Sequence, residues 1–197
     1  LFTRDFSIEY VAQYSNRSLS WFYTFAAFWA GQAGSLLLWA WLLGVFAVVL
    51  LWQYRRRPQE LLPYTLGVIS VTTFFFVLLL VFKSNPFAKL PFTPQDGNGL
   101  NPLLQNPGMI FHPPSLYVGF VGYTVPFAFA IAALLNKKLE SGWLKSIRRW
   151  SLFSWVFLTI GNILGMQWAY VELGWGGYWA WDPVENSSLL PWLTGTA

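Results

Sequence analysis

Three stretches of this chain, residues 61–82, 114–135 and 150–171, each run for 22 residues without a charged side chain. A bilayer core is crossed by about 20 residues of helix, so each stretch is long enough to span a membrane. Composition agrees, because 55% of the residues are hydrophobic and only 10% are charged, against about 25% charged in soluble domains. These stretches therefore predict an integral membrane protein.

A fourth uncharged run, of 37 residues, lies between Arg17 and Arg55 and is longer than one span requires. Its second half, residues 34–54, is the better membrane helix. The first half, which carries Trp21 and Trp29, is expected either to lie at the interface or to continue as a tilted helix. With a further span expected to start at Asn186, the predicted fold is an all-α polytopic transmembrane bundle of four full spans and the start of a fifth.

One membrane domain covering residues 1–197 is the simplest division of the chain, since no internal repeat or low-complexity linker is visible. The fifth span is cut short at Ala197, and the chain begins at Leu1 without a methionine or a signal-type stretch. We therefore expect it to be a fragment of a longer protein.

Basic residues divide unequally between the two ends of the expected spans. Eight of the twelve fall in the connections after the first and third spans: Arg55, Arg56, Arg57, Lys137, Lys138, Lys145, Arg148 and Arg149. The positive-inside tendency places these eight in the cytoplasm, so the amino terminus, residues 83–113 and residues 168–186 are expected to face outward. The net charge of +4 then reflects anchoring among membrane lipids and indicates no nucleic acid partner, because the basic residues form no stripe or groove.

Residues 83–113 are expected to form an irregular outer loop, since their many prolines and Asn-Gly steps exclude a regular helix. The loop ends at Pro113 and Pro114, which suit the first turn of the third span because the amide hydrogens they lack would have no helical partner there. His112, the only histidine, is thus expected at a helix start on the outer surface.

Two interpretations of His112 are open. It is either a capping or interfacial histidine, or a ligand for a metal. The positive end of a helix dipole disfavours imidazolium, and a neutral imidazole can bind a metal. One histidine in a chain without cysteine cannot hold zinc or copper alone. It can serve as an axial ligand to an iron that arrives with a porphyrin.

Aromatic residues concentrate between residues 168 and 192, where five tryptophans and two tyrosines are interleaved with three glycines. An aromatic belt explains isolated tryptophans at span ends. It does not account for five within one short segment. Glycines let a flat ligand approach the backbone, and indoles offer large apolar faces. The candidate binding residues are Trp168, Trp175, Gly176, Gly177, Tyr178, Trp179, Trp181 and Asp182.

The carboxylates near this segment have a structural interpretation that we favour. Asp182 is followed by a proline and, at the third helical position, by Glu185, which is typical of a capped helix start. Glu172 is expected to contact a cationic partner or to be solvated. No residue is an evident nucleophile, so catalytic residues are unknown.

Residues 175–186 resemble the tryptophan-rich "WWD" signature of the heme-handling proteins of cytochrome c assembly, which include the CcmF, CcmC and CcsA types. The extended ending Asp-Pro-Val-Glu-Asn, together with residues 99–107 and 111–114, is most similar to the CcmF/NrfE-type heme lyase subunit. Residues 21–35 are similar to that subunit's early region.

The resemblance implies that heme is the cofactor, that residues 168–186 form an outward-facing heme platform and that two outer histidines can ligate the iron. His112 matches the first of them. The CcmF type also carries two histidines within the membrane that bind a structural heme b. The remaining three are absent from this chain and would lie beyond Ala197 in a longer parent.

The function implied is that of a membrane subunit of cytochrome c heme lyase, which positions heme while the thiols of apocytochrome c add to its vinyl groups. Implied partners are a heme chaperone, apocytochrome c and other cytochrome c maturation subunits, in a bacterial or, alternatively, a mitochondrial inner membrane. A heme exporter or loader of the CcmC type without lyase activity is the main alternative. A transporter or channel with an aromatic gate is less favoured, because the span interiors lack charge.

Overall fold

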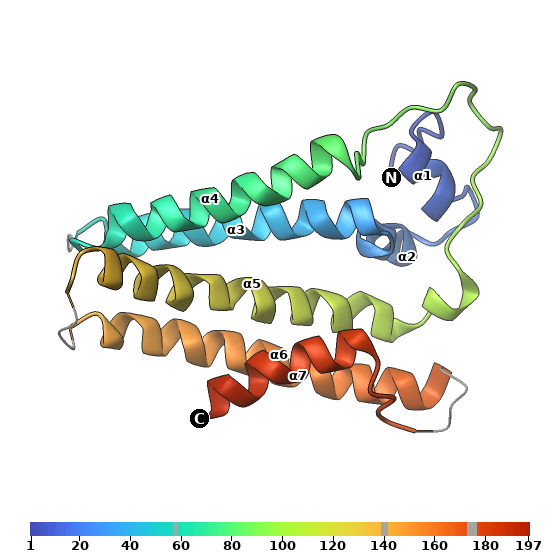
Figure 1. Ribbon diagram of the computed structural model, residues 1–197. Coiled ribbons are helices and arrows are strands. Elements are labelled where there is room, and N and C mark those ends of the chain that lie inside the picture. The colour runs from blue at the N-terminus through green and yellow to red at the C-terminus, as the bar shows by residue number, and fades with distance from the viewer. Residues whose placement is uncertain (57–58, 139–141, 173–176) are drawn as a thin grey trace.

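A computed structural model describes residues 1–56, 59–138, 142–172 and 177–197, which form a bundle of helices (Figure 1). In chain order the elements are α1 Glu9–Tyr14, α2 Trp21–Ala26, the 3-10 turn η1 Ala27–Trp29, α3 Gln32–Tyr54, α4 Leu62–Phe82, the 3-10 turn η2 Pro102–Leu104, α5 Pro107–Leu135, α6 Leu144–Glu172 and α7 Pro183–Thr196. Four of them, α3 to α6, are long and apolar enough to cross a membrane. The predicted all-α transmembrane bundle is confirmed, and α7 begins three residues before the expected Asn186.

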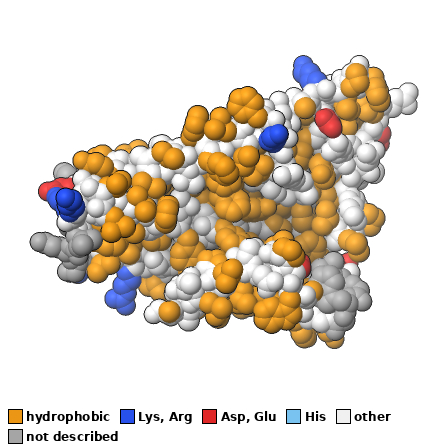
Figure 2. All heavy atoms as spheres, in the orientation of Figure 1, with side chains coloured by type: hydrophobic (Ala, Val, Ile, Leu, Met, Phe, Trp, Pro, Cys, Tyr) orange, Lys and Arg blue, Asp and Glu red, His pale blue; other side chains and the backbone are white. Residues whose placement is uncertain are grey.

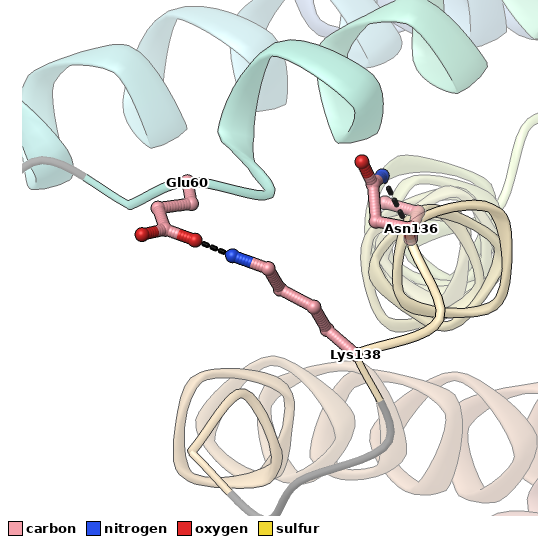
Figure 3. Close-up of polar contacts among 4 residues, drawn as sticks. Glu60, Asn136 and Lys138 are labelled. Carbon is pink, nitrogen blue, oxygen red and sulfur yellow. Dashed lines mark hydrogen bonds and ion pairs between the residues drawn. The ribbon is translucent and has the colours of Figure 1, made fainter.

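The connections between the long helices gather at two opposite ends of the bundle (Figure 1). The residues after α3 and after α5 share one end, where Glu60 forms an ion pair with Lys138 (Figure 3). The amino terminus, the loop between α4 and α5, and the described residues that lead into α7 share the other. The loop before α5 and the aromatic residues before α7 therefore lie at the same end, which the charge pattern had indicated.

Large apolar side chains cover the outside of the bundle, which suits contact with lipid. Figure 2 shows hydrophobic side chains along much of the visible face, between charged side chains that lie toward the two ends. On α4, Val71, Phe74 and Phe75 are all exposed. Their backbone groups need no water, since an α-helix satisfies its hydrogen bonds internally.

Helices α5 and α6 pack against each other through positions that lack a side chain. A Cβ atom added at Gly119 would lie 2.7 Å from the backbone nitrogen of Leu158, and one added at Gly161 would lie 3.0 Å from that of Leu116. Small residues allow such close approach, and close van der Waals packing is what associates helices in lipid. This contact fixes which faces of α5 and α6 meet.

The start of α5 differs from the prediction. The helix begins at Pro107, where the side chain of Asn106 accepts a hydrogen bond from the backbone nitrogen of Gly108 at 2.7 Å. His112 consequently lies in the second turn, and Pro113 and Pro114 lie inside the helix. The expected start at these two prolines was wrong because an Asn-Pro step upstream supplies a complete helix start of its own.

A tryptophan compensates for one of these internal prolines. Pro113 has no N–H, so the carbonyl of Met109, four residues earlier, lacks its usual helical donor. The indole Nε1 of Trp29 donates to that oxygen at 2.9 Å, and the contact is buried. A proline is tolerated within α5 partly because a neighbouring element restores the missing hydrogen bond.

Residues 18–31 do not continue α3 as a tilted helix. They contain α2 and η1, and the extended Gly31, with φ −118° and ψ 164°, separates these from α3. Trp21 is 63% exposed, whereas Trp29 is only 6% exposed. The two tryptophans therefore have different roles, and the buried one joins η1 to α5.

Replacing Trp29 by Phe should lower the free energy of unfolding by about 1–3 kcal/mol, because the Met109 carbonyl would be left buried without a donor. Thermal or denaturant unfolding in detergent measures this. The matched control is Trp21→Phe at an exposed indole, which should change stability little. Equal stabilities of the two variants would contradict the role given to the indole N–H.

Candidate functional site

The imidazole of His112 is held against the backbone of α6. Its Nδ1 lies 2.8 Å from the carbonyl oxygen of Gly161. A carbonyl only accepts hydrogen bonds, so Nδ1 must carry a proton and donate it, and in the neutral imidazole Nε2 is then the unprotonated nitrogen. A hydrogen bond from one ring nitrogen to a carbonyl commonly orients an imidazole whose other nitrogen binds a metal.

Gly165 provides the space in which this ring lies. A Cβ atom added there would come within 2.5 Å of Cε1 and 2.9 Å of Nδ1 of His112. Trp168, one turn further along α6, meets the imidazole edge-on with ring centroids 5.7 Å apart. Its indole also packs on Gly108 at the start of α5. Both helices therefore contribute to the orientation of the ring.

The described residues before α7 place two more indoles beside this pair. Trp179 and Trp181 meet edge to face with centroids 6.0 Å apart. Trp181 has a φ of +58°, a left-handed conformation that is uncommon for a bulky residue and costs about 1–2 kcal/mol. Tyr178 stacks on Tyr170 of α6 with centroids 4.5 Å apart. The stacked tyrosines fix one side of the segment to α6, while Trp181 turns the chain into α7.

The structural interpretation of the carboxylates at α7 agrees with the contacts. Asp182 accepts a hydrogen bond from the backbone nitrogen of Glu185 at 2.7 Å, and Glu185 accepts one from that of Asp182 at 3.3 Å and one from that of Ala180 at 2.8 Å. This reciprocal pair is a capping box. Both side chains therefore begin α7 and stabilise its first turn.

Glu172 makes a contact within the chain that the sequence did not predict. Its carboxylate accepts a hydrogen bond from the side-chain nitrogen of Asn106 at 2.6 Å. Asn106 is also the residue that caps α5. The contact links the end of α6 to the start of α5, close to the helical turn that carries His112.

One cavity of about 190 Å³ brings four of the predicted binding residues together. His112, Trp168, Trp179 and Asp182 line it, and its other lining residues are Leu116, Asn162, Gly165, Met166, Ala169, Val184, Glu185 and Ser188. The indole Nε1 atoms of Trp168 and Trp179 are buried and have no hydrogen-bond partner within the described part of the chain. Buried donors are normally satisfied, so these two are suited to a ligand that carries acceptor atoms.

A second, larger cavity of about 450 Å³ adjoins the first and is lined mainly by apolar side chains. Its lining residues are Thr159, Asn162, Ile163, Met166, Trp179, Trp181, Leu189 and Trp192. Asn162, Met166 and Trp179 line both cavities. The first alone is smaller than the 300–1,000 Å³ typical of ligand pockets, whereas the two together fall within that range. A large flat ligand would therefore extend past Trp179 into both.

Several other predicted site residues do not line the His112 cavity. Trp175 and Gly176 lie outside the described residues. Gly177 and Tyr178 line neither cavity. Sequence reasoning missed Asn162, Gly165 and Met166, although they lie on α6 at helical spacing before Trp168 and could have been found by projecting that helix face.

Gly165→Ala should displace the imidazole from the Gly161 carbonyl, since the new Cβ would overlap the ring. In protein labelled with ¹⁵N-histidine, the wild-type His112 signals, assigned by their loss in His112→Gln, should show a protonated Nδ1 and an unprotonated Nε2. The variant should show a mixture of tautomers. Gly67→Ala is the control, because an added Cβ there meets nothing within 4 Å. An unchanged Nδ1-protonated signal in Gly165→Ala would contradict the assigned contact.

Comparison with known proteins gives a consistent result. A family described as "Cytochrome C assembly protein" matches residues 29–197. The chain is 54% identical to "Cytochrome c-type biogenesis protein CcmF" of Haemophilus influenzae, over 98% of this chain and 30% of that protein. It is 50% identical to the CcmF protein of Escherichia coli, over 98% of this chain and 30% of that protein. It is 49% identical to the "Probable cytochrome c-type biogenesis protein NrfE" of the same organism, over 98% of this chain and 35% of that protein.

The chain thus spans about a third of the length of these curated relatives. No solved structure matches it significantly. The similarity extends over nearly the whole chain and includes every described residue that lines the His112 cavity.

Proposed function

Because this chain belongs to the cytochrome c assembly protein family and is of the CcmF/NrfE type, we propose that its His112 cavity binds heme and positions it for covalent attachment to apocytochrome c. The observation that carries this proposal is the single cavity shared by His112, Trp168, Trp179 and Asp182. An isolated aromatic belt would give no reason for an imidazole to share a cavity with these indoles.

The residues present fit a heme. Nε2 of His112, unprotonated in the neutral ring, would ligate the heme iron, while the Gly161 carbonyl orients the ring through Nδ1. Trp179 lies between the two cavities and would contact the macrocycle. The unpartnered indole N–H groups of Trp168 and Trp179 would donate to the carboxylate groups that heme carries.

The two carboxylates in the cavity do not exclude an anionic ligand. Asp182 and Glu185 already accept hydrogen bonds from backbone amides of the α7 start. Those charge-assisted contacts compensate part of their negative charge, so it repels a nearby carboxylate less.

The chain's own contribution would be to hold heme and orient it. Bound heme would supply two vinyl groups; a cysteine thiol of apocytochrome c would add across each, its sulfur bonding to one vinyl carbon and its proton going to the other. Fixing heme through His112 and the indoles makes this encounter nearly unimolecular, an effect that reaches about 7–11 kcal/mol in favourable cases. No nucleophile from this chain is required.

The side of the membrane on which we propose that heme binds follows from the position of the cavity in the bundle. The cavity lies at the bundle end that carries fewer basic residues, which the positive-inside tendency assigns to the outer face. Heme chaperone, apocytochrome c and other maturation subunits would reach it there, and residues 1–197 would form one membrane domain. The relatives named above come from bacteria, which favours the bacterial inner membrane over the mitochondrial one.

Substituting His112 by Ala in the full-length protein should abolish or strongly reduce covalent heme attachment, because the iron would lose its ligand in this cavity. Cytochrome c yield, measured by heme staining at matched levels of the membrane protein, tests this. Phe111→Ala alters the adjacent, exposed residue of α5 and should leave the yield unchanged. Normal yield in His112→Ala would remove the assigned role. Heme retained by the wild type without any attachment would favour the CcmC-type alternative.

Replacing Trp179 and Trp181 together by Ala should weaken heme binding by about tenfold or more, since each aromatic contact contributes about 0.5–1.5 kcal/mol beyond its buried area. Titration of the Soret band with added heme measures this affinity. Trp41→Ala with Trp52→Ala removes two exposed indoles of α3 and serves as the control. A Soret titration that is the same in both double variants would place the heme elsewhere.

A further inference from the structure

A third cavity, different in character from the two near His112, lies at the opposite end of the bundle. It has a volume of about 650 Å³ and lies between the last turn of α3 and the first turns of α6. Its lining residues are Gln53, Tyr54, Lys145, Ser146, Arg148, Arg149 and Leu152. Three of these seven side chains are cationic and none is acidic.

The three cations lie close together at the start of one helix. Lys145, Arg148 and Arg149 are spaced i, i+3 and i+4 on α6, so they are neighbours on one helix face, and like charges at this spacing destabilise a helix. They also occupy the first two turns, next to the positive end of the helix dipole. An anion bound among them would relieve both effects.

The carboxylates that the structure describes compensate little of this charge. Among the acidic side chains that the structure describes, only Glu60 lies at this end of the bundle. Glu60 is paired with Lys138 (Figure 3), and Glu140 lies outside the described residues. No carboxylate among the described residues lines the cavity.

The cavity also has an apolar side that continues along the bundle. Leu152 lines it and is exposed, and Val156, one turn further along α6, is exposed as well. Deeper in the bundle, Phe46 of α3 meets Trp150 of α6 with ring centroids 5.4 Å apart, so the two helices are joined below the opening. The result is a cationic mouth at the membrane boundary above an apolar path.

We propose that this cavity binds the headgroup of an anionic phospholipid. Its phosphate lies among Lys145, Arg148 and Arg149, where the guanidinium groups can donate paired hydrogen bonds, and an acyl chain follows Leu152 and Val156. Basic pockets between transmembrane helices are typical sites for anionic headgroups. Free phosphate shares the charge but would not use the apolar path.

Native mass spectrometry of the full-length protein in detergent, titrated with phosphatidylglycerol, tests the proposal. Each cation near an anionic headgroup contributes about fivefold in affinity. The triple variant Lys145→Gln, Arg148→Gln, Arg149→Gln should therefore lose on the order of a hundredfold for the tightest lipid. Arg55→Gln, Arg56→Gln, Lys137→Gln is the control, because it removes the same charge from the same end but from residues that do not line the cavity. It should retain the tight site.

Competition experiments distinguish a lipid headgroup from free phosphate as the bound anion. Phosphatidylcholine and inorganic phosphate should neither occupy the site nor displace phosphatidylglycerol from it. Equal losses in the two triple variants would show diffuse attraction and overturn the proposal, and full displacement by phosphate would overturn the lipid assignment. If the cavity triple variant does not fold, Arg149→Gln alone should still lose about fivefold relative to Arg56→Gln, and equal affinities of these single variants would overturn the proposal.

Discussion

The close approach of α5 to α6 is the contact on which the candidate site depends. Glycines at positions 119 and 161 allow the backbone of each helix to reach side chains of the other. Only at that separation can the imidazole of His112 lie 2.8 Å from a carbonyl of the facing helix. In lipid, no difference in hydrophobicity drives two helices together, so the shape of this interface determines which faces meet. The orientation of the one histidine is therefore a consequence of helix packing.

Much of the architecture could be predicted because its signals are local. A run of 22 uncharged residues predicts a span wherever it occurs, and α5 and α6 contain two of the runs in full, while α4 contains the third except for Leu61, its N-cap residue. The distribution of arginine and lysine then predicts which connections share an end. These two patterns were enough to expect His112 and the tryptophan-rich segment at the same end, where the structure has His112, Trp168 and Trp179 in one cavity.

What the sequence did not predict depends on contacts between distant elements. The start of α5 was expected at Pro113, but an indole 80 positions from Met109 supplies the hydrogen bond that this proline removes. Glu172 could not be matched to Asn106 without knowing how α5 and α6 align. Asn162 and Met166 belong to no recognisable motif. They could be assigned to the site only once it was known that they line the same cavity as His112 and Trp168. Local patterns fix the elements, and the interfaces between elements determine the site.

The arrangement has a simple chemical consequence: the chain presents one unprotonated imidazole nitrogen in a cavity walled by indoles, and a porphyrin iron is the partner that this combination suits best. The most direct measurement is a structure of the full-length protein with heme bound. We expect the iron on Nε2 of His112, the Nδ1 hydrogen bond to Gly161 retained, and the macrocycle in contact with Trp179. Heme ligated at a distance from this cavity, with Nε2 of His112 bound to no iron, would contradict the central claim.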